Sequence, residues 1–189
     1  MKRIAIFASG SGSNAENIAR YFEHHPQVEI SLILSNNPNA YVLQRAHELN
    51  IPTKVFSRDD FYKNYCVEEI LREYKIDLVV LAGFLWLIPL SMIRNYPSAI
   101  INIHPALLPK YGGKGMYGMK VHQSVVAEGD SESGITIHYV NEKYDEGATI
   151  FQARCVIEKQ DSPERVAEKV HKLEYEHFPR VIEKILFPI

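Results

Sequence analysis

The sequence is poor in the features that mark disulfide scaffolds, metal sites and membrane anchors. Only two of its 189 residues are cysteine, and neither Cys66 nor Cys155 stands in a CxxC or Cys/His spacing, so neither a disulfide framework nor structural zinc is indicated. The apolar run at the amino terminus, Ile4–Ala8, is too short for a signal peptide. The longest apolar stretch, Leu78–Leu90, falls short of the roughly eighteen residues that cross a bilayer. We therefore expect a cytoplasmic protein.

A strong excess of charge of either sign is also missing. Lys and Arg number 21 and Asp and Glu 23, for a net charge of −2, which gives no global attraction to nucleic acid or to an anionic membrane. No repeat, low-complexity tract or long linker divides the chain, and its length fits one domain of ordinary size. We expect a single domain over residues 1–189, with no nucleic-acid partner and no membrane partner.

Short apolar segments alternate with helical patterns through the first half of the chain. This alternation predicts parallel strands joined by helices, and so a doubly wound, mostly parallel α/β sheet with helices on both faces. Ligands bind such sheets at the edge where the strands end. The expected strands are Ile4–Phe7, Ile30–Leu34, Thr53–Phe56 and Leu78–Leu81, and the expected helices are Ala15–Phe22, Val42–Leu49 and Phe61–Tyr74.

The second half has a different pattern. Two alternating segments lie close enough in sequence to form an antiparallel pair, and Asp161-Ser162-Pro163-Glu164 is typical of a helix start. The glycine-rich loop Lys110–Gly118 lacks the spacing of a Walker loop and is either a flap or a plain connection. The expected elements are a strand at Ile100–Ile103, a helix at Met119–Ala127, strands at Ile135–Val140 and Thr149–Ile157, and a last helix after Ser162.

The segment Gly10–Ala15 follows the first expected strand and opens the first expected helix. It matches a dinucleotide-binding pattern, G-x-G-x-x-A. However, the second strand ends in Ser35-Asn36-Asn37 and not in an acidic residue that binds the ribose, which disfavours a nicotinamide cofactor. Backbone N–H groups at a helix start, with the hydroxyls of Ser11 and Ser13, can bind one phosphate. The alternative is a structural turn with Asn14 as helix cap.

Three side chains suited to acyl transfer follow strand ends. Asn102 lies at the end of the expected strand Ile100–Ile103 and His104 directly follows that strand. The two are two residues apart, so their side chains point the same way, and Asp145 follows the next alternating segment. An amide can hold a developing oxyanion, an imidazole can exchange a proton near pH 7, and a carboxylate can orient that imidazole and raise its pKa. As structural alternatives, His104 would bond a backbone carbonyl, Asn102 would bond loop backbone, and Asp145 would be a turn residue. The remaining histidines show no metal-ligand spacing.

Together, four motifs resemble those of the phosphoribosylglycinamide formyltransferases, folate-dependent enzymes of purine synthesis. The motifs are Gly12-Ser13-Asn14, Leu81-Ala82-Gly83-Phe84, Asn102-Ile103-His104-Pro105-Ala106-Leu107-Leu108-Pro109 and Asp145-Glu146-Gly147. The resemblance implies formyl transfer from 10-formyltetrahydrofolate to the amine of glycinamide ribonucleotide, on the way to IMP, with no metal. It also implies a Rossmann-like formyltransferase fold, a phosphate-binding half over residues 1–100 and a catalytic, folate-binding half over residues 101–189. The sequence leaves open a monomer or a homodimer.

The resemblance assigns roles residue by residue. It implies catalysis by Asn102, His104 and Asp145; phosphate binding by Gly12, Ser13 and Asn14; contact with the glycinamide end by Glu174; and folate binding by Arg58, Leu85, Trp86, Leu87, Ile88 and Asn102. Within that set Arg58 is expected near the folate tail, and Trp86 departs from the arginine of many relatives. For Glu174 the structural alternative is a solvated helix carboxylate.

Three rival functions fit the sequence less well. A methionyl-tRNA formyltransferase would bring a further domain and a basic surface, and a formyltetrahydrofolate hydrolase would bring an additional amino-terminal domain. Neither feature is apparent in the sequence. A noncatalytic dinucleotide-binding module would be supported only by Gly10–Ala15.

Overall fold

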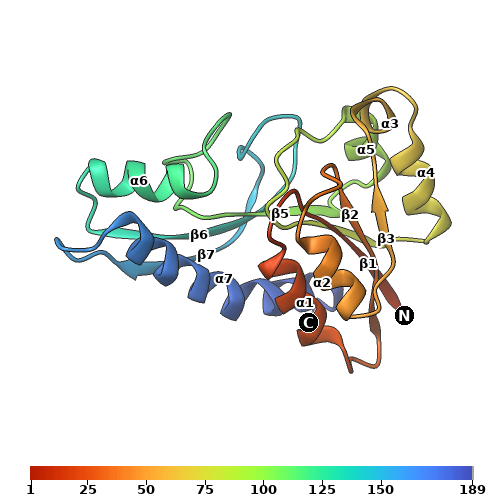
Figure 1. Cartoon of the computed structure of the whole chain (residues 1–189), viewed down its shortest axis with the longest axis horizontal. Coiled ribbons are helices and arrows are strands. Elements are labelled where there is room, and N and C mark those ends of the chain that lie inside the picture. Colours follow the sequence, from red (N-terminus) through yellow and green to blue (C-terminus); the bar gives the residue numbers. More distant parts are fainter. Residues whose placement is uncertain (189) are drawn as a thin grey trace. The chain divides into compact units, whose positions relative to one another are not determined.

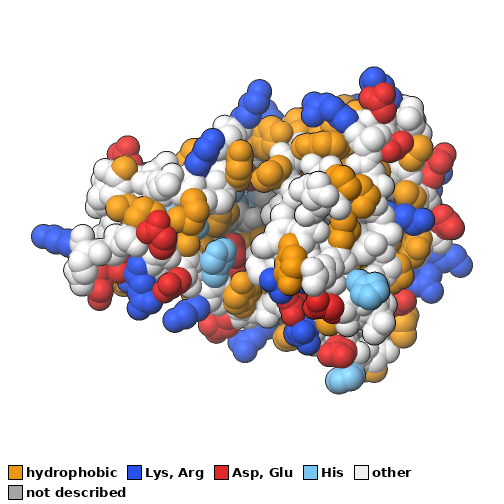
Figure 2. Space-filling model, viewed as in Figure 1, with side chains coloured by type: hydrophobic (Ala, Val, Ile, Leu, Met, Phe, Trp, Pro, Cys, Tyr) orange, Lys and Arg blue, Asp and Glu red, His pale blue; other side chains and the backbone are white. Residues whose placement is uncertain are grey.

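The computed structural model describes residues 1–188 (Figure 1). The chain divides into two compact units, one over residues 1–101 and one from Asn102 onward, and strand β5 (Ile100–His104) runs across the boundary. No helix within the described residues combines the length and the apolarity needed to span a bilayer. On the face seen in Figure 2, basic and acidic side chains are interspersed.

The first unit is the parallel α/β structure that the sequence predicts. Its strand order is β3-β2-β1-β4, followed by the first residues of β5, and β1 pairs in parallel with both β2 and β4. Right-handed crossovers place α1 and α2 on one face of these strands and α3, α4 and α5 on the other (Figure 1). The strands are β1 Lys2–Phe7, β2 Val28–Ser35, β3 Thr53–Val55 and β4 Leu78–Leu81, and the helices are α1 Ser13–Phe22, α2 Val42–Glu48, α3 Arg58–Tyr62, α4 Cys66–Glu73 and α5 Leu90–Asn95.

The prediction of one helix over Phe61–Tyr74 is wrong, because the structure has two helices there. In place of Phe61–Tyr74 the structure has α3 and α4, because two local signals divide the segment. Ser57 and Asp60 form a reciprocal capping box that starts α3 early. Tyr65, the N-cap of α4, has a left-handed backbone with φ of 57°, so helical geometry cannot continue from α3 into α4. The short helix α5, which directly follows Pro89, was not predicted.

The second unit holds the end of β5 and an antiparallel pair. Strands β5, β6 and β7 are adjacent in that order, and β6 pairs antiparallel with β7, which confirms the predicted pair. Helix α7 packs on α6, β6 and β7, and it begins after Ser162, whose side chain accepts a hydrogen bond from the Arg165 N–H. The elements are α6 Met119–Ala127, β6 Glu132–Tyr139, β7 Thr149–Val156 and α7 Pro163–Leu186.

The turn between β1 and α1 packs closely against the start of α2. The Gly10 carbonyl accepts a hydrogen bond of 3.1 Å from the Val42 N–H. Gly12 has a left-handed backbone, with φ of 72°, and a Cβ placed there would overlap the Val42 side chain. Glycine is therefore required at position 12 both by the backbone conformation and by the neighbouring helix.

We predict that Gly12→Ala destabilises the protein by about 1–3 kcal/mol more than Gly83→Ala, because only the first variant adds overpacking to the strain of a positive φ. Gly83 is a matched control, since its φ is 73° and no atom lies within 4 Å of the added Cβ. Urea unfolding of both variants measures the difference. Equal losses of stability would show that the contact with Val42 imposes no constraint.

Candidate active site

Three side chains predicted to be catalytic meet in the second unit. Asn102 and His104 lie on β5, and Asp145 lies in the loop between β6 and β7. The Asn102 amide nitrogen donates a hydrogen bond of 3.4 Å to one oxygen of Asp145, and Nδ1 of His104 lies 3.5 Å from the other oxygen. His104 is only 4% exposed. The period of two along β5 thus brings both side chains to one carboxylate.

The loop after β5 completes the contacts of His104 and Asp145. Nε2 of His104 lies 2.7 Å from the Tyr111 carbonyl oxygen, and the Gly113 N–H donates a bond of 2.9 Å to Asp145. A carbonyl oxygen can only accept, so Nε2 carries the proton in this bond. Nδ1 faces a carboxylate, which favours a second proton there. The structural alternative, in which His104 bonds a backbone carbonyl, is therefore correct for Nε2. This bond is compatible with a chemical role for the ring, because Nδ1 faces Asp145.

Burial and charge act in opposite directions on the pKa of His104. Burial lowers the pKa below 6.5, although Asp145 and the Tyr111 carbonyl both favour the protonated ring. Asp145 thus raises the pKa of His104, as the sequence predicts, but desolvation exceeds this effect and the overall pKa is lowered. With its pKa below 6.5, His104 is mainly neutral near pH 7.

Asp145 remains ionised despite its burial. Desolvation alone would raise the pKa of this carboxyl, but the neighbouring imidazoles of His138 and His104 and the hydrogen bond from the Gly113 N–H together bring the pKa below 3.8. The Asp145 backbone has φ of 56°, a left-handed conformation that Asp adopts more readily than most residues. The turn reading of Asp145 is therefore correct as far as its backbone goes.

His138 is a member of the cluster that the sequence interpretation missed. Its Nδ1 lies 2.9 Å from the Tyr139 carbonyl oxygen and must donate to it, so its Nε2 accepts from the Asn102 amide at 3.1 Å. The same Nε2 lies 3.7 Å from Asp145. His138 thereby orients the amide of Asn102. The sequence did contain a signal for this role, because His138 lies near the end of the expected strand that leads to Asp145.

A second polar group joins α6 and α7. Glu174 is 4% exposed, so the alternative of a solvated carboxylate is wrong, and it lies 2.8 Å from Nδ1 of His171, whose pKa it raises. His122 is 2% exposed, and its Nδ1 has no hydrogen-bond partner among the described residues. Burial, together with the neighbouring His171, lowers the pKa of His122 to about 4.

In the first unit, the loop predicted to bind phosphate lies at the start of α1. Gly12 occupies the N-cap position and α1 begins at Ser13, so the alternative in which Asn14 is the cap is wrong. Nε of Arg45 donates a bond of 2.8 Å to the Ser11 carbonyl oxygen, and its guanidinium pairs with Glu16. The loop is thus anchored, and it leads into a helix start, where backbone N–H groups can bind an anion in proteins generally.

The residues assigned to folate differ in how much surface they offer. The Arg58 guanidinium lies 5.6 Å from the Trp86 ring centroid and 5.1 Å from that of Tyr62. Leu85 is exposed, whereas Ile88 is buried in the core and offers little surface for a ligand. The Leu87 carbonyl accepts a bond of 2.8 Å from the Tyr62 hydroxyl.

Asp145 borders an open cavity in the second unit. The cavity has a volume of about 500 Å³ and is also lined by Leu108, Pro109, Gly113 and Tyr144. Within residues 1–188, no three His, Cys, Asp or Glu side chains gather in a geometry that would hold a metal ion. Of the three clustered side chains, the Asp145 carboxylate is the one that borders this space, and the Asn102 amide and the His104 imidazole contact Asp145.

Comparison with known proteins finds a family match over most of the chain. The formyl transferase family model matches residues 2–182. Phosphoribosylglycinamide formyltransferase from Haemophilus influenzae is 37% identical over 97% of this chain and 86% of its own, and the chloroplastic enzyme from Arabidopsis thaliana is 37% identical over 97% of this chain and 65% of its own. The crystal structure of the enzyme from Anaplasma phagocytophilum, at 33% identity, gives a TM-score of 0.89 over 97% of this chain and 86% of that one.

The buried His122 predicts how stability depends on pH. Because its pKa is about 4 in the folded protein and about 6.5 in the unfolded chain, the unfolded state binds more protons between these values. The free energy of unfolding should therefore fall as pH drops from 6.5 towards 4, by up to about 3 kcal/mol from this group alone.

Urea unfolding at pH 7, 6, 5 and 4.5 checks this, with His122→Asn expected to lose less stability than the wild type over the same range. His24→Asn, at an exposed position, controls for the loss of one histidine. The assignment to His122 is contradicted if His122→Asn and the wild type lose stability in parallel.

Proposed function

The chain belongs to the formyl transferase family, and on that premise we propose that it transfers the formyl group of 10-formyltetrahydrofolate to the amine of glycinamide ribonucleotide, a step of purine biosynthesis. The observation that carries this proposal is the meeting of Asn102, His104 and Asp145, in which the carboxylate accepts a hydrogen bond from the Asn102 amide and lies beside the buried His104 ring. The names of relatives at 36–37% identity support the choice of substrate.

In the proposed reaction the substrate amine attacks the formyl carbon. A bond forms between the amine nitrogen and that carbon, and the carbonyl oxygen becomes negative in a tetrahedral intermediate. Asn102 donates a hydrogen bond to this oxygen. His104, neutral beforehand because burial lowers its pKa, takes up a proton from water as the negative charge develops and returns it when the carbonyl forms again. Donors aimed at the developing charge are among the largest contributions to catalysis, and each is worth about a hundred-fold or more in rate.

Asp145 moves the proton that the reaction must transfer. The attacking amine becomes cationic and has to lose a proton, while the folate nitrogen has to gain one as its bond to the formyl carbon breaks. An ionised carboxylate, which the lowered pKa of Asp145 provides, accepts the first proton through water and returns it to the leaving nitrogen. The same charge stabilises the protonated ring of His104.

Substrate binding follows from the remaining assigned residues. Gly12, Ser13 and Asn14 bind the phosphate of the nucleotide at the start of α1, and Glu174 contacts its glycinamide end. The pterin pocket includes Leu85, Trp86, Leu87 and Ile88. The buried Ile88 contributes mainly backbone atoms, and Arg58 interacts with the folate tail. Many relatives have an arginine where this chain has Trp86. The Trp86 ring instead stacks on the Arg58 guanidinium.

We predict that tetrahydrofolate release, followed by absorbance, requires glycinamide ribonucleotide, and that Asn102→Ala and Asp145→Asn each lower kcat by about a hundred-fold or more. The Asn102 variant loses the oxyanion donor, and the Asp145 variant loses the proton acceptor. Circular dichroism should show both variants folded.

Glu168→Gln serves as the control, because this exposed carboxylate on α7 pairs only with Arg165 in the salt bridges of the described residues. Release of tetrahydrofolate that is independent of the nucleotide would replace the proposed transfer with hydrolysis. Near-normal kcat in Asn102→Ala or Asp145→Asn would remove that residue from the mechanism.

A further inference from the structure

Residues 106–113, here called the β5 loop, supply two of the contacts that hold the catalytic cluster. The Tyr111 carbonyl accepts from Nε2 of His104, and the Gly113 N–H donates to Asp145. Tyr111 has a left-handed backbone, with φ of 57°. Such a conformation costs a bulky residue about 1–3 kcal/mol and persists only where the surroundings impose it. Something outside the loop must therefore hold it in place.

Thr136 and Gln152 bind the backbone at the start of this loop. They are paired across β6 and β7. The Thr136 hydroxyl donates a bond of 2.7 Å to the Ala106 carbonyl and accepts one of 3.0 Å from the Leu108 N–H. The Gln152 amide donates to the Leu108 carbonyl at 3.1 Å and to the Thr136 hydroxyl at 2.9 Å. Both hydrogens of this amide and the whole capacity of the hydroxyl are thus used on the loop or on each other.

The position of Leu108 is transmitted to the catalytic end of the loop by packing. A Cβ built at Gly112 would overlap the Leu108 side chain and would approach the Cβ of Asp145 to 3.3 Å. Leu108, Gly112 and Asp145 are therefore in close contact. A shift of Leu108 would move the backbone that carries the Tyr111 carbonyl and the Gly113 N–H.

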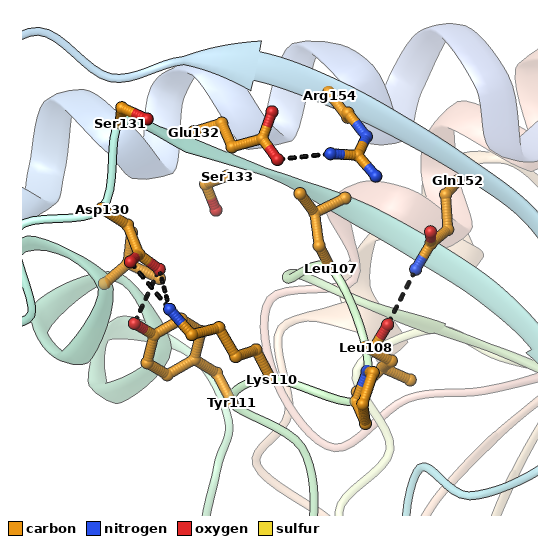
Figure 3. A pocket seen from close by; sticks show the side chains of 12 residues that line it. Leu107, Leu108, Lys110, Tyr111, Asp130, Ser131, Glu132, Ser133, Gln152 and Arg154 are labelled. Carbon is orange, nitrogen blue, oxygen red and sulfur yellow. Dashed lines mark hydrogen bonds and ion pairs between the residues drawn. The ribbon is translucent and has the colours of Figure 1, made fainter.

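On one side, the β5 loop borders a cavity and is not held by close packing. A cavity of about 460 Å³ borders Leu108, Lys110 and Tyr111, and Figure 3 shows the Gln152 amide reaching across it to the Leu108 carbonyl. On that side the loop is held by this bond and by Asp130, which binds the Lys110 ammonium at 2.7 Å and the Tyr111 hydroxyl at 2.8 Å. The Lys110 contact is exposed, and exposed ion pairs contribute little.

We propose that Gln152 and Thr136 are positioning residues for formyl transfer, which hold the β5 loop so that the Tyr111 carbonyl fixes the ring of His104 beside Asp145. The inference rests on the proposed function, because it gives His104 its role. Neither residue touches the reacting atoms. Their effect on the reaction passes through the orientation and the proton of the imidazole.

The test uses Gln152→Leu and Thr136→Val, which remove the hydrogen bonds with little change of volume. We expect kcat to fall by about ten- to a hundred-fold, since small displacements of catalytic groups have effects of this size, with KM for the nucleotide within about two-fold of wild type. The ¹⁵N-NMR titration of His104 should move to lower pH, because the Tyr111 carbonyl helps to keep its ring protonated. Thr136→Ser, which keeps the hydroxyl, should restore both readouts.

Glu132→Gln is the matched control, since Glu132 lines the same cavity and pairs with Arg154 on the opposite wall (Figure 3). It should leave kcat and the His104 titration unchanged. If Gln152→Leu and Thr136→Val lower the melting temperature while both readouts match the wild type, their role is structural and the proposal is wrong. Failure of the proposed function is distinguishable, because the wild type would then not transfer the formyl group, while the NMR titration would still report on the loop.

Discussion

An ionised carboxylate that is largely withdrawn from solvent beside an apolar strand must receive hydrogen bonds, and the arrangement of the second unit follows from this requirement. Asp145 receives them from the Asn102 amide and from the Gly113 N–H, and His104 lies beside it. Without such partners a buried charge would cost several kcal/mol or would be neutralised. Each partner is in turn fixed by a further contact, so the cluster has few alternative arrangements.

The same burial accounts for the chemistry. It lowers the pKa of His104 and would by itself raise that of Asp145, and the hydrogen bonds reverse the direction only for the carboxylate. The result is a mainly neutral imidazole beside a charged carboxylate, and in the proposed reaction this imidazole takes up a proton as the oxyanion forms. Electrostatic interactions of this kind are stronger in a site that excludes water. The fold contributes by carrying polar residues at the ends of strands that are otherwise apolar.

Much of this arrangement could be predicted from local patterns. The period of two placed Asn102 and His104 on one side of a strand, and turn chemistry marked the segment that contains Asp145. The features that were missed depend on three-dimensional contacts. The role of His138 comes from a bond between β5 and β6, and the net direction of the His104 pKa comes from a balance between burial and charge. The division into α3 and α4 depends on a left-handed Tyr65, which no residue type at that position signals.

Burial lowers the pKa of His104, and the carboxylate of Asp145 opposes this effect. A ¹⁵N-NMR titration of the His104 imidazole, in the wild type and in Asp145→Asn, measures this opposition directly. The pKa of His104 should be lower in the variant, because burial then acts without an opposing charge. A pKa that is unchanged or higher in the variant would show that Asp145 does not oppose burial.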